Sequence, residues 1–213
     1  RLKYNDQLLI LKKPFDHLEI RQMASALTWK WQLAQDVALK MIDLERTIEE
    51  RVQELLKVSR LLQYDTLTDL PNSTLLGDRL SQAIALGRRH ETELAVVFIG
   101  LDRFKRVNNA WGYPVGDEVL QQVSQSLLEA VRESDSVFRY GSDQFVVLLK
   151  DVQNIQQTQH IAQKFLNAIS VTRHVAGHDL SVTASLGIST YPNDSGSAVE
   201  LIKHAETAMH NSK

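Results

Sequence analysis

The sequence predicts an α/β fold of the α+β type, in which helices cover a mostly antiparallel central sheet and a long helix precedes the sheet domain. Three observations predict this architecture. Residues 15–70 contain no Gly or Pro. Apolar runs that are typical of strands alternate with helical patterns between residues 75 and 213. Two of these runs flank a short turn at 141–143, and so short a turn joins antiparallel neighbours.

The overall composition is that of an ordinary globular protein. Of 213 residues, 43% are apolar and 23% are charged, and the net charge of -2 argues against a nucleic-acid partner. The absence of cysteine excludes disulfides and Cys-ligated zinc, and it fits a reducing compartment such as the cytoplasm. The longest wholly apolar run, 94–99, is too short to span a bilayer, so we expect no membrane partner. Because the chain begins at Arg1, we expect it to belong to a longer protein.

The first segment, residues 1–34, opens with an apolar run at 7–11 that predicts a buried strand. The pair Lys13-Pro14 follows, and Asp16 predicts the start of a helix that runs to about residue 33. This order resembles the end of a response-regulator receiver domain, whose last strand ends in a Lys-Pro pair. The resemblance implies the remnant of a receiver domain whose phosphorylated aspartate lies upstream. Any strand–helix unit with a surface Lys-Pro pair is the alternative.

The second segment, residues 35–63, predicts a signalling helix with a coiled-coil seam. Its apolar residues recur at spacings close to a heptad repeat, with one stutter. The seam comprises Val37, Met41, Leu44, Ile48, Val52, Leu55 and Leu62, and a second stripe comprises Ile42, Leu56, Val58 and Leu61. We expect a parallel homodimer through this helix, because the helix is too long for one globular partner. An amphipathic helix packed on its own domain is the alternative.

The third segment, residues 64–213, predicts the sheet domain. Helices are expected at 75–86 after the start residues Pro71-Asn72-Ser73, at 103–110 with Asp102 as the cap, at 155–169 and at 198–211. Another helix presents Leu120, Val123, Leu127, Leu128 and Val131 on one face. Strands are expected at 94–101, which is apolar throughout and central, at 136–140 and 144–149, which form a hairpin, and at 180–190.

Several motifs of this segment resemble, in order and spacing, those of the GGDEF family, the diguanylate cyclases. The stretch Arg139-Tyr140-Gly141-Ser142-Asp143-Gln144-Phe145 resembles the signature hairpin with two of its five letters changed. The other matching pieces are 65–72, Gly100 to Asn108, Gly112 with Gly116-Asp117, 182–188 and 205–213. The resemblance implies a nucleotide-cyclase-like fold for 64–213.

The resemblance also assigns binding roles to four residues. In the family an Asn and an Asp read the guanine edge, and Asn108 and Asp117 stand at those positions. Lys105 and Lys213 match phosphate-binding lysines. From the residues alone, Asn108 and Asp117 could instead be helix caps, and both lysines could be solvated surface residues.

The metal-binding positions of the family are changed. Gly100 and Gln144 replace two of the three relevant acids, so Asp143 alone remains. Mg²⁺ prefers charged oxygen ligands, and two-metal phosphoryl transfer depends on them. Ser142 in place of Gly adds a side chain where the turn approaches the nucleotide. We therefore expect no intact catalytic site. We expect Mg²⁺ only if a nucleotide binds at the place that corresponds to the family's active site, which we name the old active site.

A second ligand site is implied by Arg132-Glu133-Ser134-Asp135, which is followed by five residues and then by Gly141. This offset matches the family's inhibitory site for cyclic di-GMP. An Arg can donate to phosphate or to the guanine Hoogsteen edge, and an Asp can accept from guanine N–H groups. A surface ion pair at a helix end is the alternative.

The resulting hypothesis is a degenerate GGDEF domain, inactive as a cyclase, that binds cyclic di-GMP or GTP and relays the signal of an upstream receiver domain. Such domains often precede a phosphodiesterase (EAL) domain, which could lie downstream. An active diguanylate cyclase that tolerates Gly100 and Gln144 is one alternative. A structural dimerisation module without a ligand is the other.

Overall fold

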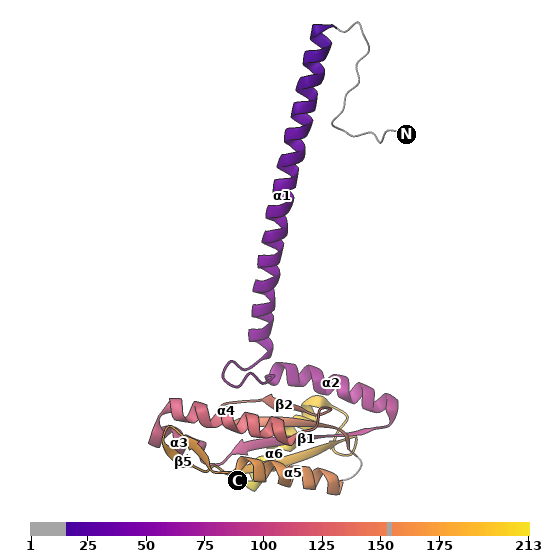
Figure 1. Cartoon of the computed structure of the whole chain (residues 1–213). Coiled ribbons are helices and arrows are strands. Elements are labelled where there is room, and N and C mark those ends of the chain that lie inside the picture. Colours follow the sequence, from indigo (N-terminus) through magenta and orange to yellow (C-terminus); the bar gives the residue numbers. More distant parts are fainter. Residues whose placement is uncertain (1–15, 153–154) are drawn as a thin grey trace. The chain divides into compact units, whose positions relative to one another are not determined.

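The structure, a computed structural model, describes residues 16–152 and 155–213. It divides into two compact units between Lys57 and Val58. Helix α1 (His17–Gln63) is followed by α2 (Ser73–His90), β1 (Glu93–Leu101), α3 (Phe104–Trp111), α4 (Tyr113–Ala130), β2 (Ser136–Arg139), β3 (Gln144–Val152), α5 (Ile155–Ile169), β4 (Arg173–Val175), β5 (His178–Leu180), β6 (Ala184–Tyr191) and α6 (Ala198–Ser212) (Figure 1). No helix among the described residues has the length and apolar character that a membrane crossing requires.

Helix α1 is continuous over 47 residues. It begins as predicted after Asp16, whose Oδ1 accepts the N–H of Leu18 at 3.1 Å. The two segments that were expected to meet at residues 34 and 35 are one helix, so this boundary has no counterpart in the secondary structure. The strand expected at 7–11 and the pair Lys13-Pro14 lie outside the described residues, and the receiver remnant stays a prediction.

The apolar seam of α1 is exposed along its whole length. No residue of α1 is buried, and the seam residues range from 43% exposed at Val52 to 68% exposed at Leu55. Most of the stability of a protein helix comes from packing its apolar face. The long helix is therefore consistent with the predicted coiled coil, in which a second helix covers this seam.

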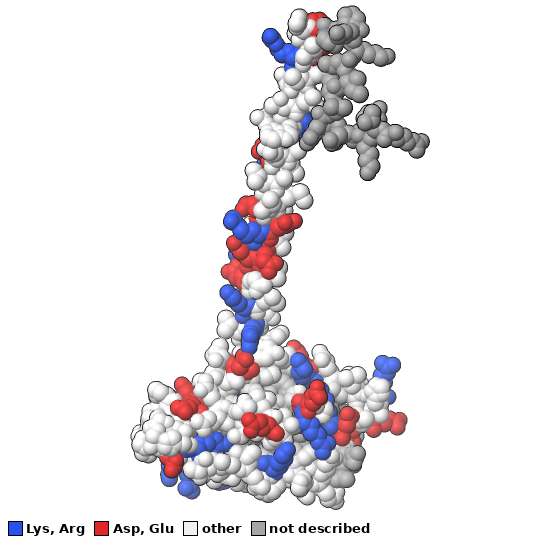
Figure 2. Space-filling view, in the orientation of Figure 1, with Lys and Arg blue, Asp and Glu red and all other residues white. Residues whose placement is uncertain are grey.

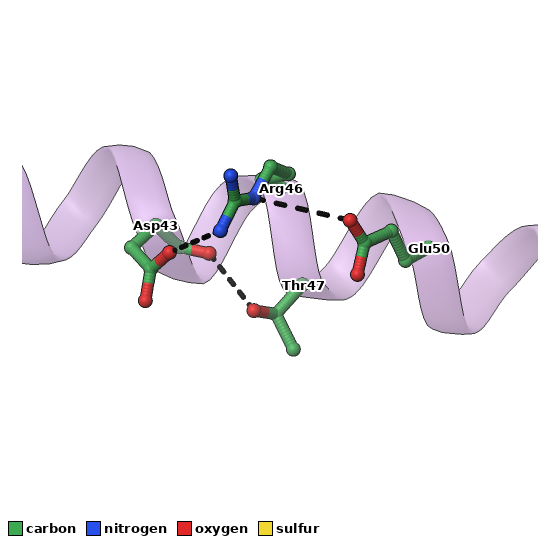
Figure 3. A network of polar contacts seen from close by, with 4 residues as sticks. All are labelled: Asp43, Arg46, Thr47 and Glu50. Atoms are coloured by element: carbon green, nitrogen blue, oxygen red, sulfur yellow. Dashed lines mark hydrogen bonds and ion pairs between the residues drawn. The ribbon is translucent and has the colours of Figure 1, made fainter.

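Charged side chains gather in a band on the C-terminal half of α1 (Figure 2). Within it, the Arg46 guanidinium lies 2.8 Å from the Asp43 carboxylate and 3.9 Å from that of Glu50 (Figure 3). The Thr47 hydroxyl donates to the main-chain carbonyl of Asp43 at 2.9 Å. Exposed pairs of this kind each contribute roughly 0.3–0.5 kcal/mol, so they support the helix without replacing the apolar packing.

The main sheet has the order β2-β3-β1-β6, and every neighbouring pair is antiparallel. The run 94–101 is buried throughout and lies between β3 and β6, as its apolar character predicts. The hairpin of β2 and β3 turns at 141–143, also as predicted.

The prediction of one strand over 180–190 is wrong. Leu180 ends β5, which pairs with β4 in a separate two-stranded sheet, and β6 begins only at Ala184. Between the two strands Val182 is buried, and the carbonyl of Thr183 accepts the N–H of Asp102 at 2.8 Å. These contacts interrupt the ladder and divide the run.

Helices cover both faces of the main sheet (Figure 1). Side chains of α3, α4 and α5 pack on the face that holds Val97 and Val147, whereas α2 and α6 pack on the face that holds Val96 and Val146. Helix α6 approaches β6 most closely at Gly187, where a Cβ would collide with the α6 backbone at Ala205. This close approach fixes α6, and with it the residues that end the helix.

The start of α2 matches the sequence analysis. The Oδ1 of Asn72 accepts the N–H groups of Thr74 at 3.0 Å and Leu75 at 3.2 Å. The Nδ2 of Asn72 donates to the carbonyl of Leu62 at 2.9 Å, so the same side chain ties α2 to the end of α1.

Two other expectations at helices are wrong, and so is one of the alternatives. Asp102 does not cap α3, because Arg103 occupies the N-cap with a left-handed φ of 51° and the Asp102 carboxylate bonds elsewhere. Asp117 does not cap α4, because this helix begins at Tyr113 and Asp117 lies inside it. Leu128 is 45% exposed, because buried residues of α4 such as Val123 and Leu127 form the inner face of the helix instead.

Candidate functional site

Three positions stand side by side where the central strands end. Gly100 of β1 pairs with Gln144 of β3 and with Ser185 of β6. Residues directly opposite one another in antiparallel strands share one face of the sheet. On that face Gly100 has no side chain, Gln144 carries an amide and Ser185 a hydroxyl, so the row contains no acidic group.

The end of α6 fills the space above Gly100. A Cβ at position 100 would lie 2.8 Å from Sδ of Met209 and 3.0 Å from Nζ of Lys213. The ammonium group of Lys213 therefore lies where a side chain at position 100 would project. Lys213 was predicted as a site residue, and the structure places it against the changed metal position.

A cavity of about 380 Å³ opens beside this row, lined by Asp102, Arg103, Thr183, Ser185, Ser212 and Lys213. The hydroxyl of Thr183 donates to Oδ2 of Asp102 at 2.7 Å, and that of Ser185 donates to Oδ1 at 2.8 Å. Both oxygens of this carboxylate thus have a hydroxyl partner. Arg103 and Lys213 place two cationic side chains in the lining of the cavity.

The hairpin turn is closed by main-chain bonds and by one buried guanidinium. The N–H groups of Tyr140 and Gly141 donate to the carbonyl of Gln144 at 3.0 and 3.3 Å. Nε of Arg139 donates to the carbonyl of Gly141 at 2.5 Å, and its Nη2 donates to that of Ser142. The exposed hydroxyl of Ser142 donates to Asp143 at 3.1 Å, so the added side chain engages the remaining acid of the turn.

Sequence reasoning gave Arg139 no role, although it stands at the start of the signature stretch. The residue is 6% exposed, and its Nη1 is the one buried side-chain polar atom without a hydrogen-bond partner among the described residues. Burial lowers the pKa of Arg139, and the carboxylates of Asp65, Asp143 and Asp117 oppose that shift. The main-chain N–H of Arg139 donates to the carbonyl of Pro71 at 2.8 Å. Arg139 therefore holds the turn and connects it to the loop that follows α1.

The residues present do not fit the family's metal ions. Among the described residues there is no group of three His, Cys, Asp or Glu side chains that could hold a metal. Asp143 is the single acid of the turn. The side-chain oxygen of Gln144 lies 3.0 Å from where a Cβ on Gly141 would stand, so the amide leans back over the turn. A dication near Gly100 would also meet the like charge of Lys213.

The predicted guanine-binding residues lie together between α3 and α4. Oδ1 of Asn108 lies directly against Gly116, at a place that any Cβ on residue 116 would occupy. The neighbouring Asp117 is exposed. Lys105 is exposed in the first turn of α3, three positions before Asn108. The Gly at 116 is what lets the Asn108 amide lie against α4 at the position that precedes Asp117.

Arg132 and Asp135 lie on the turn between α4 and β2. Oδ2 of Asp135 accepts the main-chain N–H of Arg132 at 3.3 Å, and Oδ1 accepts the N–H of Lys150 at 3.2 Å. Oδ1 also accepts the hydroxyl of Ser134 at 3.4 Å, so Asp135 is engaged by two main-chain N–H groups and one neighbouring hydroxyl. The side chain of Arg132 is exposed at this turn.

Arg103, Thr183 and Ser185 are site residues that the sequence reasoning missed. A usable signal was present, because the hydroxyls alternate at 183 and 185, as residues on one face of an extended chain do. Their shared partner Asp102 was instead expected to cap a helix. Only the pairing of β1 with β6 brings Asp102 beside Thr183 and Ser185.

Residues 62–213 match the family described as "Diguanylate cyclase, GGDEF domain". The chain is 38% identical over 154 residues to the bifunctional diguanylate cyclase/cyclic di-GMP phosphodiesterase MucR of Pseudomonas aeruginosa, covering 72% of this chain and 22% of MucR. It therefore spans about a fifth of the length of that relative.

Two solved structures share the fold. The GGDEF domain of TpbB from Pseudomonas aeruginosa matches with a TM-score of 0.69 at 34% identity, covering 70% of this chain and 88% of that one. The coiled coil and GGDEF domain of DgcB from Caulobacter crescentus, in complex with c-di-GMP, matches with a TM-score of 0.73 at 23% identity, covering 83% of this chain and 93% of that one. With the family match extending from residue 62 to residue 213 and the sheet, turn and covering helices in the same arrangement, this chain belongs to the GGDEF family.

Proposed function

We propose that this GGDEF domain acts in cyclic di-GMP signalling as a binding and relay module without cyclase activity. The observation that carries the proposal is the row of Gly100, Gln144 and Ser185 beneath the ammonium group of Lys213. Two-metal phosphoryl transfer needs carboxylates to hold the cations that clamp the attacking and leaving oxygens. A glycine, an amide and a hydroxyl beside the positive charge of Lys213 do not supply them.

The preferred ligand is cyclic di-GMP, bound at Arg132 and Asp135. The main-chain bonds of Asp135 fix the turn. Its Oδ2, which accepts the N–H of Arg132, keeps a second lone pair for a guanine N–H group, whereas Oδ1 accepts from both Lys150 and Ser134. The exposed guanidinium of Arg132 can donate to phosphate or to the guanine edge. None of the changes at Gly100, Ser142 or Gln144 alters this turn.

Calorimetry with cyclic di-GMP tests the ligand assignment. A bidentate Arg contact to guanine is worth roughly 1–3 kcal/mol, so Arg132→Ala should weaken binding about tenfold or more. Lys105→Ala removes another exposed cation, at the other site, and should leave the affinity unchanged. Absence of heat with the unaltered protein at high micromolar ligand, or a larger loss with Lys105→Ala, would move the ligand to the old active site.

The second candidate is GTP held at the old active site as an allosteric ligand. The fit of Asn108 against Gly116 favours it, because the corner formed with Asp117 keeps the guanine-reading pair of the family. Lys105 and Lys213 would then serve the phosphates. By the pattern of the family Mg²⁺ would accompany GTP, although the donor set at the turn does not fit that ion.

The relay would run through a parallel homodimer formed by α1. The exposed seam of α1 supports this assembly, and a receiver domain upstream is the proposed source of the signal. The name of MucR joins a cyclase to a phosphodiesterase, which supports a phosphodiesterase (EAL) domain downstream as a further proposal. The proposed location is the cytoplasm.

A further inference from the structure

The end of α6 bears on how phosphate charge is neutralised at the old active site. The hydroxyl of Ser212 donates to the carbonyl of Leu186 at 3.2 Å and to that of Met209 at 2.8 Å. The close approach of α6 to Gly187 holds the helix against β6 about two turns before Lys213. Lys213 therefore starts from a fixed point, and its Nζ lies over Gly100 because no side chain there excludes it.

The charges around the cavity favour an anion over a cation. Arg103 and Lys213 contribute positive charge to its lining, and the single carboxylate, Asp102, is engaged by two hydroxyls. Lysine binds phosphate well as a compact point charge. A divalent cation in this place would be repelled by both basic side chains.

From this we infer that the phosphate groups of a guanine nucleotide bind beside Gly100 without a divalent cation, with Lys213 standing in the metal's place and Arg103 beside it. The inference rests on the second candidate function, GTP as an allosteric ligand, and changes its cofactor requirement. The loss of the acid at position 100 and the position of Lys213 are then one adaptation, because an Asp side chain would have to occupy the space that the ammonium group fills.

Calorimetry of the full chain with GTP, in excess EDTA and separately in excess MgCl₂, tests the inference. Binding should persist in EDTA and be equal to or tighter than in MgCl₂, because Mg²⁺ on the triphosphate opposes Lys213. Hydrogen bonds to charged groups are worth roughly 1.5–3 kcal/mol, so Lys213→Met should weaken binding in EDTA about tenfold or more. Lys203→Met removes an exposed lysine from the same helix and should change nothing.

A second variant tests the exchange of roles directly. Gly100→Asp should abolish most binding in EDTA, because the new carboxylate neutralises Lys213, and should make the remaining binding depend on MgCl₂. The atoms nearest to the new Cβ are side-chain atoms, Sδ of the buried Met209 and Nζ and Cε of the exposed Lys213. Adjustment of these two side chains, without movement of the backbone, should let the variant fold, and cyclic di-GMP binding verifies this. Binding of GTP to the unaltered protein only in MgCl₂ would overturn the inference.

The two proposals can fail separately. If GTP binds in neither buffer while cyclic di-GMP binds through Arg132, the metal-free site is wrong and the proposed function stands. If GTP binds in EDTA and is also converted to cyclic di-GMP in MgCl₂, the proposed lack of activity is wrong and the metal-free mode of binding stands.

Discussion

At the scale of single residues, Asn72 has two separable tasks. Its oxygen caps α2 and its nitrogen reaches the end of α1. Loss of an N-cap costs roughly 0.5–2 kcal/mol, so Asn72→Ala should lower the free energy of unfolding by about that amount in urea denaturation. Asn72→Asp keeps the capping acceptor and removes only the donor to Leu62. It should therefore recover most of the loss, and an Asp variant as unstable as the Ala variant would contradict the assignment.

The predicted site residues divide by how far their roles depend on tertiary structure. The Asn72 cap and the hairpin turn are local in sequence, and both were predicted. The contact of Lys213 with Gly100 depends on how α6 crosses the sheet, which no local pattern encodes. Asp102 shows the opposite error: its position before a helix favoured a cap, whereas strand pairing gave it the hydroxyls of Thr183 and Ser185.

At the scale of elements, two glycines form a matched pair of tests for α6 and α2. A Cβ at Gly187 would collide with the backbone of Ala205, Ala208 and Met209, whereas a Cβ at Gly77 in α2 would meet nothing within 4 Å. Gly187→Ala should thus destabilise the protein at the upper end of roughly 1–3 kcal/mol. Gly77→Ala should stabilise it by about 0.5–1 kcal/mol. Thermal unfolding checks both, and a tolerated Gly187→Ala would contradict the close packing of α6 on β6.

The seam of α1 supports a prediction about assembly. Leu44 and Ile48 are 59% and 54% exposed, and a partner helix would bury them. Leu44→Glu with Ile48→Glu should therefore convert the proposed dimer to monomer in sedimentation experiments at micromolar concentration. Gln32→Glu with Gln53→Glu adds the same charge off the seam and should leave the dimer intact. A monomeric unaltered protein would refute the coiled coil.

Element boundaries were predicted where apolar periodicity is strong and missed where tertiary contacts interrupt it. The central strand and α5 agree closely with the sequence analysis, because their apolar patterns are unbroken. The run 180–190 was divided because Val182 turns into the core. Helix α4 starts at Tyr113, earlier than the alternative with Asp117 as a cap requires, since Gly112 is its N-cap.

At the scale of the whole molecule, the fold and the chemistry point in different directions. Residues 62–213 have the family's sequence and fold, and MucR carries the name of a cyclase. The row of Gly100, Gln144 and Ser185 lacks the acids on which the chemistry of that name depends. Because one fold can host different functions, membership of the family does not by itself assign the activity.

The measurement that tests this account most directly is the conversion of GTP to cyclic di-GMP by the purified full chain in MgCl₂, followed by chromatography. TpbB, assayed in parallel, serves as the positive control, because its name is that of a cyclase. The account predicts no product from this chain. Gly100→Asp with Gln144→Glu restores two acids and tests whether they suffice beside Ser142. Appreciable cyclic di-GMP from the unaltered protein would contradict the central claim that this GGDEF domain binds and relays without making the dinucleotide.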